Sequence, residues 1–365
     1  MRTMVPEDEA ARTADQARML ANRLRKRFRH LIKWSRRTGA GAFRLYDRDI
    51  PEIPLVLDWY GGALAGALYK RPYEKDEAAE ECWLDAMKAA AAEALGIEPH
   101  HIFLKHRERQ RGLSQYEKTG ERHFIREVQE NGLVFRVNLS DYLDTGLFLD
   151  RRLTRAMVRS EAAGRRVLNL FCYTGSFSVY AAAGNAVLSD SVDLSNTYLE
   201  WAGENFALNG FSAEMVKVDD IFRPGYPSLK RESAEKAGTH RLIRADALAF
   251  LGRAVAAGRK WDLIILDPPS FSNSKKMTGV LDLRRDYAEL IARCLALLSP
   301  GGKLWFSANT RLFNPGDSGP EAVLAARLPG VTVTELGNKT VDEDFRGRKT
   351  PLTLVIAKGG MAAPV

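Results

Sequence analysis

Apolar runs of strand length alternate with helix-like segments through the second half of the chain. The runs RVLNLF, NAVLSDSVD, RLIRAD and WDLIILD begin at residues 166, 185, 241 and 261, and segments with a helical spacing of apolar residues follow them. Parallel strands that are buried on both faces need crossover helices between them, so this alternation predicts a doubly wound, mostly parallel sheet. We therefore expect an α/β fold for residues 141–365.

The preceding residues have a different pattern. Residues 16–37 predict one basic helix, and strand-like runs at 55–60, 101–105, 124–130 and 134–138 accompany an alanine-rich helix at 76–95. This mixture predicts a smaller α+β domain with antiparallel pairing. We divide the chain into a basic helical extension (1–42), a small α+β domain (43–140) and the large domain (141–365), which carries a charged surface insertion at 211–240.

Composition indicates where the chain works. With 365 residues, 45% of them hydrophobic, the chain can bury a full core. Its cysteines, Cys82, Cys172 and Cys294, are too widely spaced for a zinc site and suggest no disulfide framework, which favours a reducing compartment. The N-terminal residues lack the apolar core of a secretory signal, and no apolar run is long enough to cross a bilayer. We expect a cytoplasmic protein without a metal centre, and the sequence is compatible with a monomer.

Positive charge is concentrated near the N-terminus. The net charge is +8, and residues 18–48 hold eleven Lys or Arg and a single acid, with Phe28, Trp34, Phe43 and Tyr46 among them. Such arrays bind phosphates and their aromatic rings can stack on bases, so we favour contact with RNA or another polyanion over a merely solvated amphipathic helix. The candidate RNA-binding residues are Arg25, Lys26, Arg27, Arg29, Lys33, Arg36 and Arg37, with Arg107, Arg109, Arg111, Lys275 and Lys276 further along the chain.

Three aspartates end successive predicted strands. Ligands of open α/β sheets bind beyond the carboxyl ends of the strands, where Asp193 could accept two ribose hydroxyls and Asp246 an adenine amino group. Gly175 would let a ligand approach the first turn closely. No G-x-G-x-x-G and no G-K-S/T is present, which disfavours a pyrophosphate. Each aspartate alone is more often a helix N-cap, but the three together favour S-adenosylmethionine over NAD or ATP.

The third aspartate opens the sequence DPPSF. Pro268 and Pro269 lack amide donors and restrict φ, so the backbone after Asp267 should be stiff, with carbonyl groups free to accept hydrogen bonds. Asp267 and a proline carbonyl could hold the N–H edge of a planar base while Phe271 stacks on its face, a contact worth roughly 1–3 kcal/mol. The alternative is a proline-rich loop with a core phenylalanine. We interpret Asp267, Pro268, Pro269 and Phe271 as catalytic residues.

Several motifs together carry a family resemblance. The segments DYLDTGLFLDRR, NLFCYTGSFS, VDLSNTYLEWAGENFALNG, RADALAFL and DLIILDPPSFSNSKKM, with the basic segment from residue 22, resemble the carboxyl-terminal half of the bifunctional bacterial ribosomal large-subunit RNA methyltransferases K/L. That half forms 7-methylguanine in 23S ribosomal RNA. The similarity spans residues 22 to 344 or so, and it implies a class I S-adenosylmethionine-dependent methyltransferase fold.

The resemblance also implies roles for single residues. Asp193 would bind the cofactor ribose and Asp246 the adenine, FCYTG would surround the methionine moiety, TGLFLDRR would close over the cofactor, and Asp267 would face the target base. The cofactor-binding residues so implied are Phe148, Asp150, Arg152, Asn169, Phe171, Tyr173, Thr174, Gly175, Asp193, Leu194, Asp246, Ala247 and Asp267.

The activity implied is methyl transfer to guanine N7 of 23S ribosomal RNA, free or in a ribosomal precursor. N7 has an available lone pair, so alignment and water exclusion would suffice, with Asp267 as orienting group and counter-charge. Cytosine C5 transfer would need a thiol nucleophile, and no cysteine follows the proline pair closely. Transfer to guanine N2 or adenine N6 and a non-catalytic role in ribosome assembly are the alternatives. The other half of the bifunctional family has no counterpart in this sequence, so we expect this chain to act alone.

Overall fold

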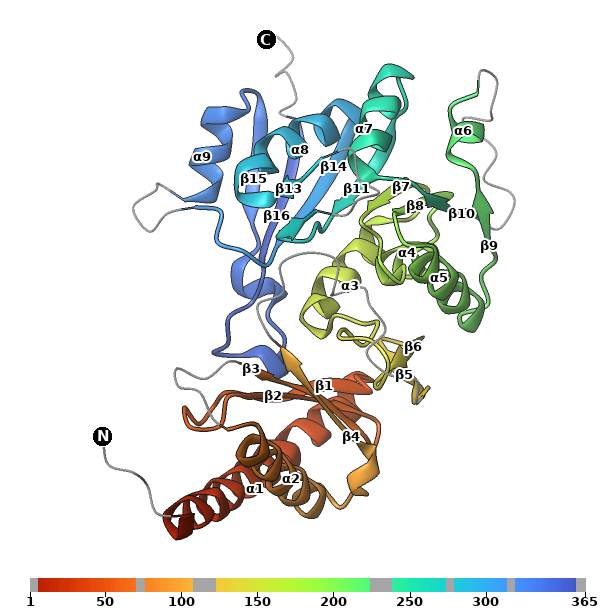
Figure 1. Ribbon diagram of the computed structural model, residues 1–365. Helices are drawn as coiled ribbons and strands as arrows, with labels where there is room; N and C mark the ends of the chain where they lie inside the picture. The colour runs from red at the N-terminus through yellow and green to blue at the C-terminus, as the bar shows by residue number, and fades with distance from the viewer. Residues whose placement is uncertain are drawn as a thin grey trace.

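The computed structural model describes residues 6–69, 76–107, 123–223, 238–273, 279–313 and 319–358. Figure 1 shows a large sheet flanked by helices and, apart from it, a smaller sheet that carries α1 and α2. Within these residues, no helix combines the length and the apolar character that crossing a bilayer requires.

The large sheet has the strand order β15-β16-β14-β11-β7-β8-β10-β9. The strands from β14 to β9 run parallel, and β16 is antiparallel to both β14 and β15. Their bounds are β7 (Arg166–Leu170), β8 (Leu188–Asp193), β9 (Ala213–Val216), β10 (Thr239–Arg244), β11 (Trp261–Leu266), β14 (Leu298–Ala308), β15 (Val331–Glu335) and β16 (Leu352–Lys358). The predicted doubly wound, mostly parallel sheet is confirmed.

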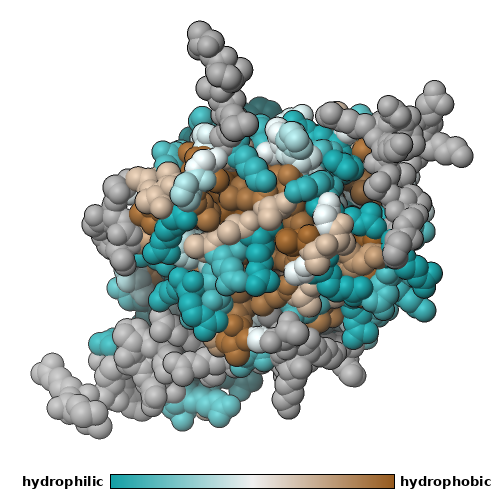
Figure 2. All heavy atoms as spheres, turned by 90° about the horizontal axis from the view of Figure 1, so that it is seen from above, coloured by the Kyte–Doolittle hydropathy of each residue, from teal (hydrophilic) through white to brown (hydrophobic). Residues whose placement is uncertain are grey.

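Helices cover both faces of this sheet. Successive side chains of a strand point to opposite faces, so in β11 Ile264 and Leu266 join one core cluster while Leu263 and Ile265 join another. The first face packs against α7 (Ala247–Ala256), α8 (Leu283–Leu297) and α9 (Pro320–Arg327), and the second against α3 (Arg152–Glu161), α4 (Ser176–Ala183) and α5 (Asn196–Leu208). Figure 2 looks onto the end of this part that lies away from α1, where apolar residues reach the surface between polar ones.

The smaller sheet has the order β1-β2-β3-β4. Its strands are β1 (Ala42–Asp47), β2 (Leu55–Tyr60), β3 (Leu64–Tyr69) and β4 (Ile102–Arg107), and it packs with α1 (Pro6–Thr38) and α2 (Glu77–Leu95). β1, β2 and β3 pair antiparallel, but β4 is parallel to β3. The expectation of antiparallel pairing throughout is therefore wrong for β4, because α2 lies between the two strands in the sequence and serves as their crossover connection.

The aromatic residues near the N-terminus belong to the core of this smaller part. Phe43 and Tyr46 have no exposed surface, Trp34 is 6% exposed, and the half-buried ring of Phe28 lies 4.7 Å from that of Trp59. The expectation that these rings are available to stack on bases is wrong, because Phe28 and Trp34 on α1 and Phe43 and Tyr46 on β1 pack together in one core cluster.

A hairpin of β5 (Ile125–Glu130) and β6 (Leu133–Asn138) lies against α5. Its turn, Asn131-Gly132, has φ of 51° and 78°, which matches the two-residue turns that favour Asn-Gly. The amide of Val134 donates to the Asn209 side chain at 2.8 Å, which fixes the hairpin on the helix layer of the large sheet. The domain boundary at residue 140 stays a prediction.

The expected insertion at 211–240 is not one surface loop. Residues 213–216 form the edge strand β9, which pairs in parallel with β10, and α6 (Val218–Ile221) places Ile221 in the core at 1% exposure. Residues 239–240 already belong to β10, and 224–237 lie outside the described residues.

Candidate active site

The carboxyl ends of β11, β7, β8 and β10 lie at one edge of the large sheet. The register aligns the last residues of β11 and β7 with Val192, one residue before the end of β8, and it places the end of β10 beside that of β8. Neighbouring strands are about 5 Å apart, so Asp193 at the end of β8 and Asp246 and Asp267 just after β10 and β11 share this edge. The strand order reverses between β7 and β11, which is where open α/β sheets bind ligands.

Backbone amides hold the carboxylate of Asp193. The Tyr173 N–H donates to Oδ2 at 2.9 Å and the Ser195 N–H to Oδ1 at 2.9 Å. Burial raises the pKa of Asp193 to about 6, and backbone hydrogen bonds, including one from Leu194, oppose that rise. Each carboxylate oxygen has two lone pairs, so the group can accept further donors.

The loop between β7 and α4 has an unusual backbone. Phe171, Tyr173 and Gly175 have φ of 57°, 53° and 73°, a conformation that is uncommon for the two aromatic residues. Strained positions of this kind gather at functional sites. The Thr174 hydroxyl donates to the Gly146 carbonyl at 2.6 Å, which ties the loop to the segment before α3.

Gly175 serves the packing of α4 on α5. A Cβ atom at this position would lie 2.8 Å from the Cβ of Ala202 in α5, and its φ of 73° is itself unfavourable for other residues. The glycine is therefore required by a neighbouring helix, and close approach of a ligand to this turn stays a prediction.

Other predicted cofactor-binding residues have partners within the protein. The Asn169 side chain is buried and donates to the Ser178 hydroxyl at 2.9 Å. Asp246 is the N-cap of α7 and accepts from the Leu248 N–H at 3.0 Å, while Ala247 is buried at 4% exposure. The N-cap geometry expected for a lone aspartate is thus present, and contact of these residues with a cofactor stays a prediction.

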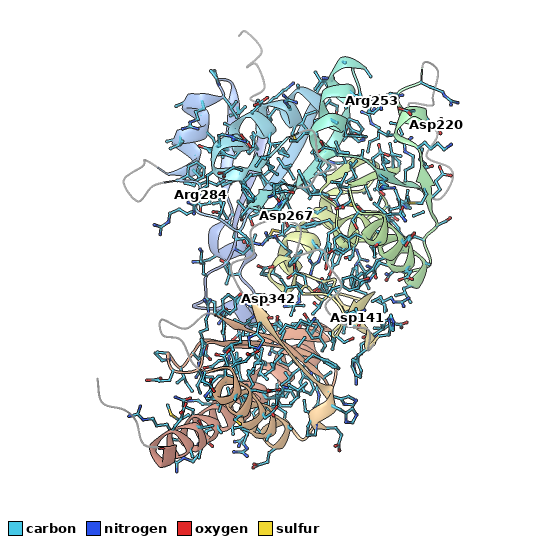
Figure 3. The ribbon with its side chains drawn as sticks, in the orientation of Figure 1. Asp141, Asp220, Arg253, Asp267, Arg284 and Asp342 are labelled. Atoms are coloured by element: carbon cyan, nitrogen blue, oxygen red, sulfur yellow. The ribbon has the colours of Figure 1, made fainter. Side chains whose placement is uncertain are left out.

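Asp267 sits on a short stiff loop. Pro268 after it is buried, Pro269 is half-buried, and Phe271 is 43% exposed in β12 (Phe271–Ser272), which pairs with β13 (Leu281–Asp282). The Phe271 ring is therefore exposed enough to meet a planar partner. The alternative interpretation, in which Phe271 is a core residue of a proline-rich loop, does not fit this exposure. Figure 3 shows Asp267 at the end of the large sheet that lies towards the smaller part.

The structure adds a residue that sequence reasoning missed. Arg151, at the end of the 3-10 helix η3 (Leu149–Arg151), donates from Nε to Oδ2 and from Nη2 to Oδ1 of Asp267, both at 2.8 Å. Its side chain is only 3% exposed. The available signal was a run of arginines after Asp150, but the pattern does not say which of them faces the sheet.

Arg152, by contrast, lies in another carboxylate cluster. Its Nη1 donates to Asp342 at 3.0 Å and Asp344 at 3.1 Å, and its Nη2 donates to the Ala42 carbonyl at 2.6 Å. Figure 3 shows Asp342 where the chain descends towards the smaller part. Arg152 is thus engaged in joining the two parts, and its role as a cofactor-binding residue stays a prediction.

Phe148 and Asp150 also belong to the segment before α3. Phe148 lies against the loop between β7 and α4, and Asp150 lies against Arg151. The Phe148 ring is 40% exposed and lies 5.2 Å from the Tyr173 ring, and Asp150 lies 3.5 Å from Nη1 of Arg151. Among the described residues, no group of three or more His, Cys, Asp or Glu is arranged to hold a metal ion.

The candidate RNA-binding residues of α1 fall into two groups. Arg25 forms an ion pair with Glu93 at 2.7 Å, and half-buried Arg27 donates to the Asp344 carbonyl at 3.4 Å. The second group is exposed and forms no ion pair with a described residue; it comprises Lys26, Arg29, Lys33, Arg36 and Arg37, hereafter the exposed α1 cations. Arg109, Arg111, Lys275 and Lys276 lie outside the described residues, as does the side chain of Arg107 in β4.

Comparisons with known proteins bear on this geometry. Residues 42–230 match the model of a family described as S-adenosylmethionine-dependent methyltransferase. The ribosomal RNA large subunit methyltransferase K of Neisseria meningitidis is 45% identical over 90% of this chain and 84% of its own length. The methyltransferase K/L of Hahella chejuensis is 45% identical over 84% of this chain, which spans 39% of that relative.

Solved structures share the fold. A crystal structure of a methyltransferase complexed with SAH has a TM-score of 0.67 and 22% identity, and the match covers 93% of this chain and 81% of that one. A methyltransferase from Streptococcus mutans has a TM-score of 0.64 and 21% identity over the same shares of the two chains. At these identities the likeness concerns the fold.

Proposed function

This chain belongs to the family of S-adenosylmethionine-dependent methyltransferases, among the relatives of the ribosomal RNA large subunit methyltransferases K and K/L, and we propose that it methylates guanine N7 in 23S ribosomal RNA. The observation that best supports this proposal is the placement of Asp193 and Asp267 at the ends of strands on either side of β7, with the exposed ring of Phe271 close behind Asp267 in the sequence.

The cofactor of the family is S-adenosyl-L-methionine, and the end of β8 fits its ribose. Asp193 accepts only backbone N–H groups among the described residues, and its two oxygens keep acceptor capacity for two hydroxyls. Hydroxyl donors would also favour the ionised form of a carboxylate whose pKa is raised by burial. The left-handed Phe171 and Tyr173 shape the neighbouring loop.

The bound cofactor supplies an electrophilic methyl group, and the protein aligns the acceptor. Guanine N7 carries an in-plane lone pair at neutral pH, so Asp267 need not act as a general base. Its carboxylate can accept an N–H of the base, and its negative charge favours the positive charge that the methylated guanine acquires. Phe271 can stack on the ring, and Pro268 keeps the loop stiff.

The exposed α1 cations supply a surface for the RNA backbone. They follow one another at helical spacing on the solvent side of α1, while Leu20, Leu24 and Leu31 are fully buried on its other side. Cations that are not neutralised by a neighbouring carboxylate can bind phosphates and release their counterions. We propose that this side of α1 holds the RNA while the base enters the site.

The proposal is tested by nucleoside mass spectrometry. The full chain is incubated with S-adenosyl-L-methionine and unmodified 23S ribosomal RNA, either free or in ribosomal precursor particles, and the RNA is digested to nucleosides. We expect 7-methylguanosine to appear with the wild type and to be nearly absent with Asp267→Asn. N2-methylguanosine or N6-methyladenosine in its place would contradict the N7 assignment. Cofactor binding without methylation of either substrate would indicate the non-catalytic role.

A further inference from the structure

The ion pair between Arg151 and Asp267 has the geometry of an orienting device. The guanidinium donates two parallel hydrogen bonds of 2.8 Å, one to each oxygen, across 116 residues of sequence. A bidentate fork of this kind fixes the plane of the carboxylate as well as its position. The side chains of Arg151 and Asp267 are 3% and 18% exposed, so the carboxylate retains access from one side.

Arg151 is itself held in place. Its Nη1 is buried, lies 3.5 Å from Asp150 and makes no hydrogen bond among the described residues. Arg152 next to it is anchored to Asp342 and Asp344, and Arg155 one turn later forms a fork with Glu130 at 2.8 and 2.9 Å. Because the contacts of Arg152 and Arg155 fix the backbone that follows Arg151, Arg151 can impose its geometry on Asp267.

We propose that Arg151 is a positioning residue for the methyl transfer: it orients the Asp267 carboxylate so that the lone pairs left free by the ion pair are directed at the N–H edge of the target base. This inference rests on the proposed function. The fork uses one lone pair on each oxygen and leaves one on each available. A carboxylate free to rotate would meet the base in several orientations, and misplacement of a reacting group by about 1 Å can cost about 100-fold in rate.

The same strand provides a matched control. At the other end of β11, Arg166 donates to Asp262 from Nε and Nη2, both at 3.1 Å. This pair has the same chemistry but lies at the edge of the sheet opposite the site. Loss of Arg166 therefore removes an arginine–aspartate fork from β11 without touching Asp267.

The experiment compares the wild type with Arg151→Lys, Arg151→Gln, Asp267→Asn and the double variant Arg151→Gln/Asp267→Asn. Arg166→Gln is the separate control. For each, turnover on 23S ribosomal RNA and cofactor affinity by calorimetry are measured. We expect Arg151→Gln to lower kcat about 10- to 100-fold with cofactor affinity changed less than about twofold, and Arg151→Lys to retain part of the activity because it keeps the charge without the fork. Arg166→Gln should keep wild-type turnover.

The double variant decides whether Arg151 acts through Asp267. If it does, Arg151→Gln/Asp267→Asn is no slower than Asp267→Asn alone. Multiplicative losses, an undiminished rate in Arg151→Gln, or an equal loss in Arg166→Gln would each overturn the inference. A wild type that binds the cofactor but methylates no RNA would instead overturn the proposed function, which keeps the two failures distinct.

Discussion

At the scale of single residues, Asp193 shows how burial and hydrogen bonds act in opposite directions on one carboxylate. Burial removes water and raises its pKa, whereas the N–H groups of Tyr173 and Ser195 lower it, and the balance places the pKa at about 6. The ionised carboxylate can accept hydroxyls with both oxygens, while the protonated acid has lost part of that capacity. Cofactor binding should therefore depend on pH through this residue.

We expect cofactor affinity to be constant above about pH 7 and to fall as the pH drops below about 6. Hydroxyl donors favour the ionised form, so binding lowers the pKa of Asp193 and releases a proton in the acidic range. Calorimetry at several pH values in buffers of different ionisation enthalpy measures both effects. Asp193→Asn should bind more weakly at neutral pH and lose this pH dependence, so that its affinity and that of the wild type converge at acidic pH; an unchanged dependence in that variant would contradict the assignment.

Asp193 and Asp267 should differ in what their loss affects. Asp193→Ala should weaken cofactor binding about 10- to 100-fold, because it removes hydrogen bonds to a charged acceptor worth roughly 1.5–3 kcal/mol. Asp267→Ala should leave cofactor affinity nearly unchanged and lower turnover about 100- to 1000-fold, as for other groups that act mainly on the transition state. Calorimetry and single-turnover methylation separate the two quantities. Equal cofactor affinity in Asp193→Ala and wild type would exclude the ribose role.

The sequence predicts strand-end acids well and their partners poorly. Asp193, Asp246 and Asp267 can be found because parallel strands place their carboxyl ends at one edge. Arg151 could not be assigned, because its ion pair joins residues 116 positions apart and nothing local distinguishes it from Arg152. The contact between the Gly175 position and α5 was also hidden, since it depends on how closely α5 approaches.

At the scale of elements, α1 combines packing with charge display. Its apolar stripe is buried in the smaller part, Arg23 and Arg25 pair with Asp49 and Glu93, each at 2.7 Å, and the exposed α1 cations face solvent. The two interpretations of this helix from sequence, packing and polyanion contact, are therefore compatible. The exposed α1 cations can contribute to a salt-dependent interaction without first breaking an ion pair with a described residue, whereas Arg23 and Arg25 cannot.

Replacing Lys26, Arg29, Lys33 and Arg36 together by Gln should weaken RNA binding and reduce the slope of log K against log salt by about 3 units. The reason is that each phosphate contact releases condensed counterions. Filter binding at several salt concentrations measures the slope. A charge-matched control replaces Lys88, Arg253, Lys260 and Arg293, which lie outside α1 and have protein partners. Equal slopes in the two quadruple variants would exclude α1 as the RNA surface.

Element positions follow from local signals, and pairing does not. The helix expected at 76–95 is present as Glu77–Leu95, because Asp76 caps its start and Gly96, with φ of 63°, ends it. The parallel pairing of β4 with β3 depends instead on where α2 returns the chain. The aromatic residues of the basic segment were misread for a similar reason, since burial is decided by the sheet that packs on α1.

At the scale of the whole molecule, Arg152 joins the smaller part to the segment that carries Arg151. It binds Asp344 within η6 (Glu343–Phe345), Asp342 at the N-cap of that helix, and the carbonyl of Ala42 at the start of β1. The same short helix contacts α1, because His30 lies 2.8 Å from Glu343. A continuous set of contacts therefore leads from the helix with the exposed α1 cations to the residue next to Arg151.

Arg152→Ala should destabilise the protein by about 3–5 kcal/mol, because it leaves buried carboxylates without their counter-ion. Asp344 has no exposed surface, and burial raises its pKa while Arg152 lowers it. Chemical denaturation followed by tryptophan fluorescence measures the free energy of unfolding. Lys303→Ala is the control, since its ion pair with Glu161 at 2.8 Å is partly exposed and should contribute less than about 1 kcal/mol.

The pH dependence of this loss identifies its cause. Without Arg152, the pKa of Asp344 should rise further, so protonation of the folded protein at acidic pH removes the uncompensated charge. The destabilisation by Arg152→Ala should therefore shrink as the pH is lowered from 7 towards about 5. Adding Asp344→Asn to Arg152→Ala should recover part of the stability at neutral pH. If the loss were independent of pH and Asp344→Asn recovered nothing, lost packing and the lost hydrogen bond to Ala42 would account for it instead of charge.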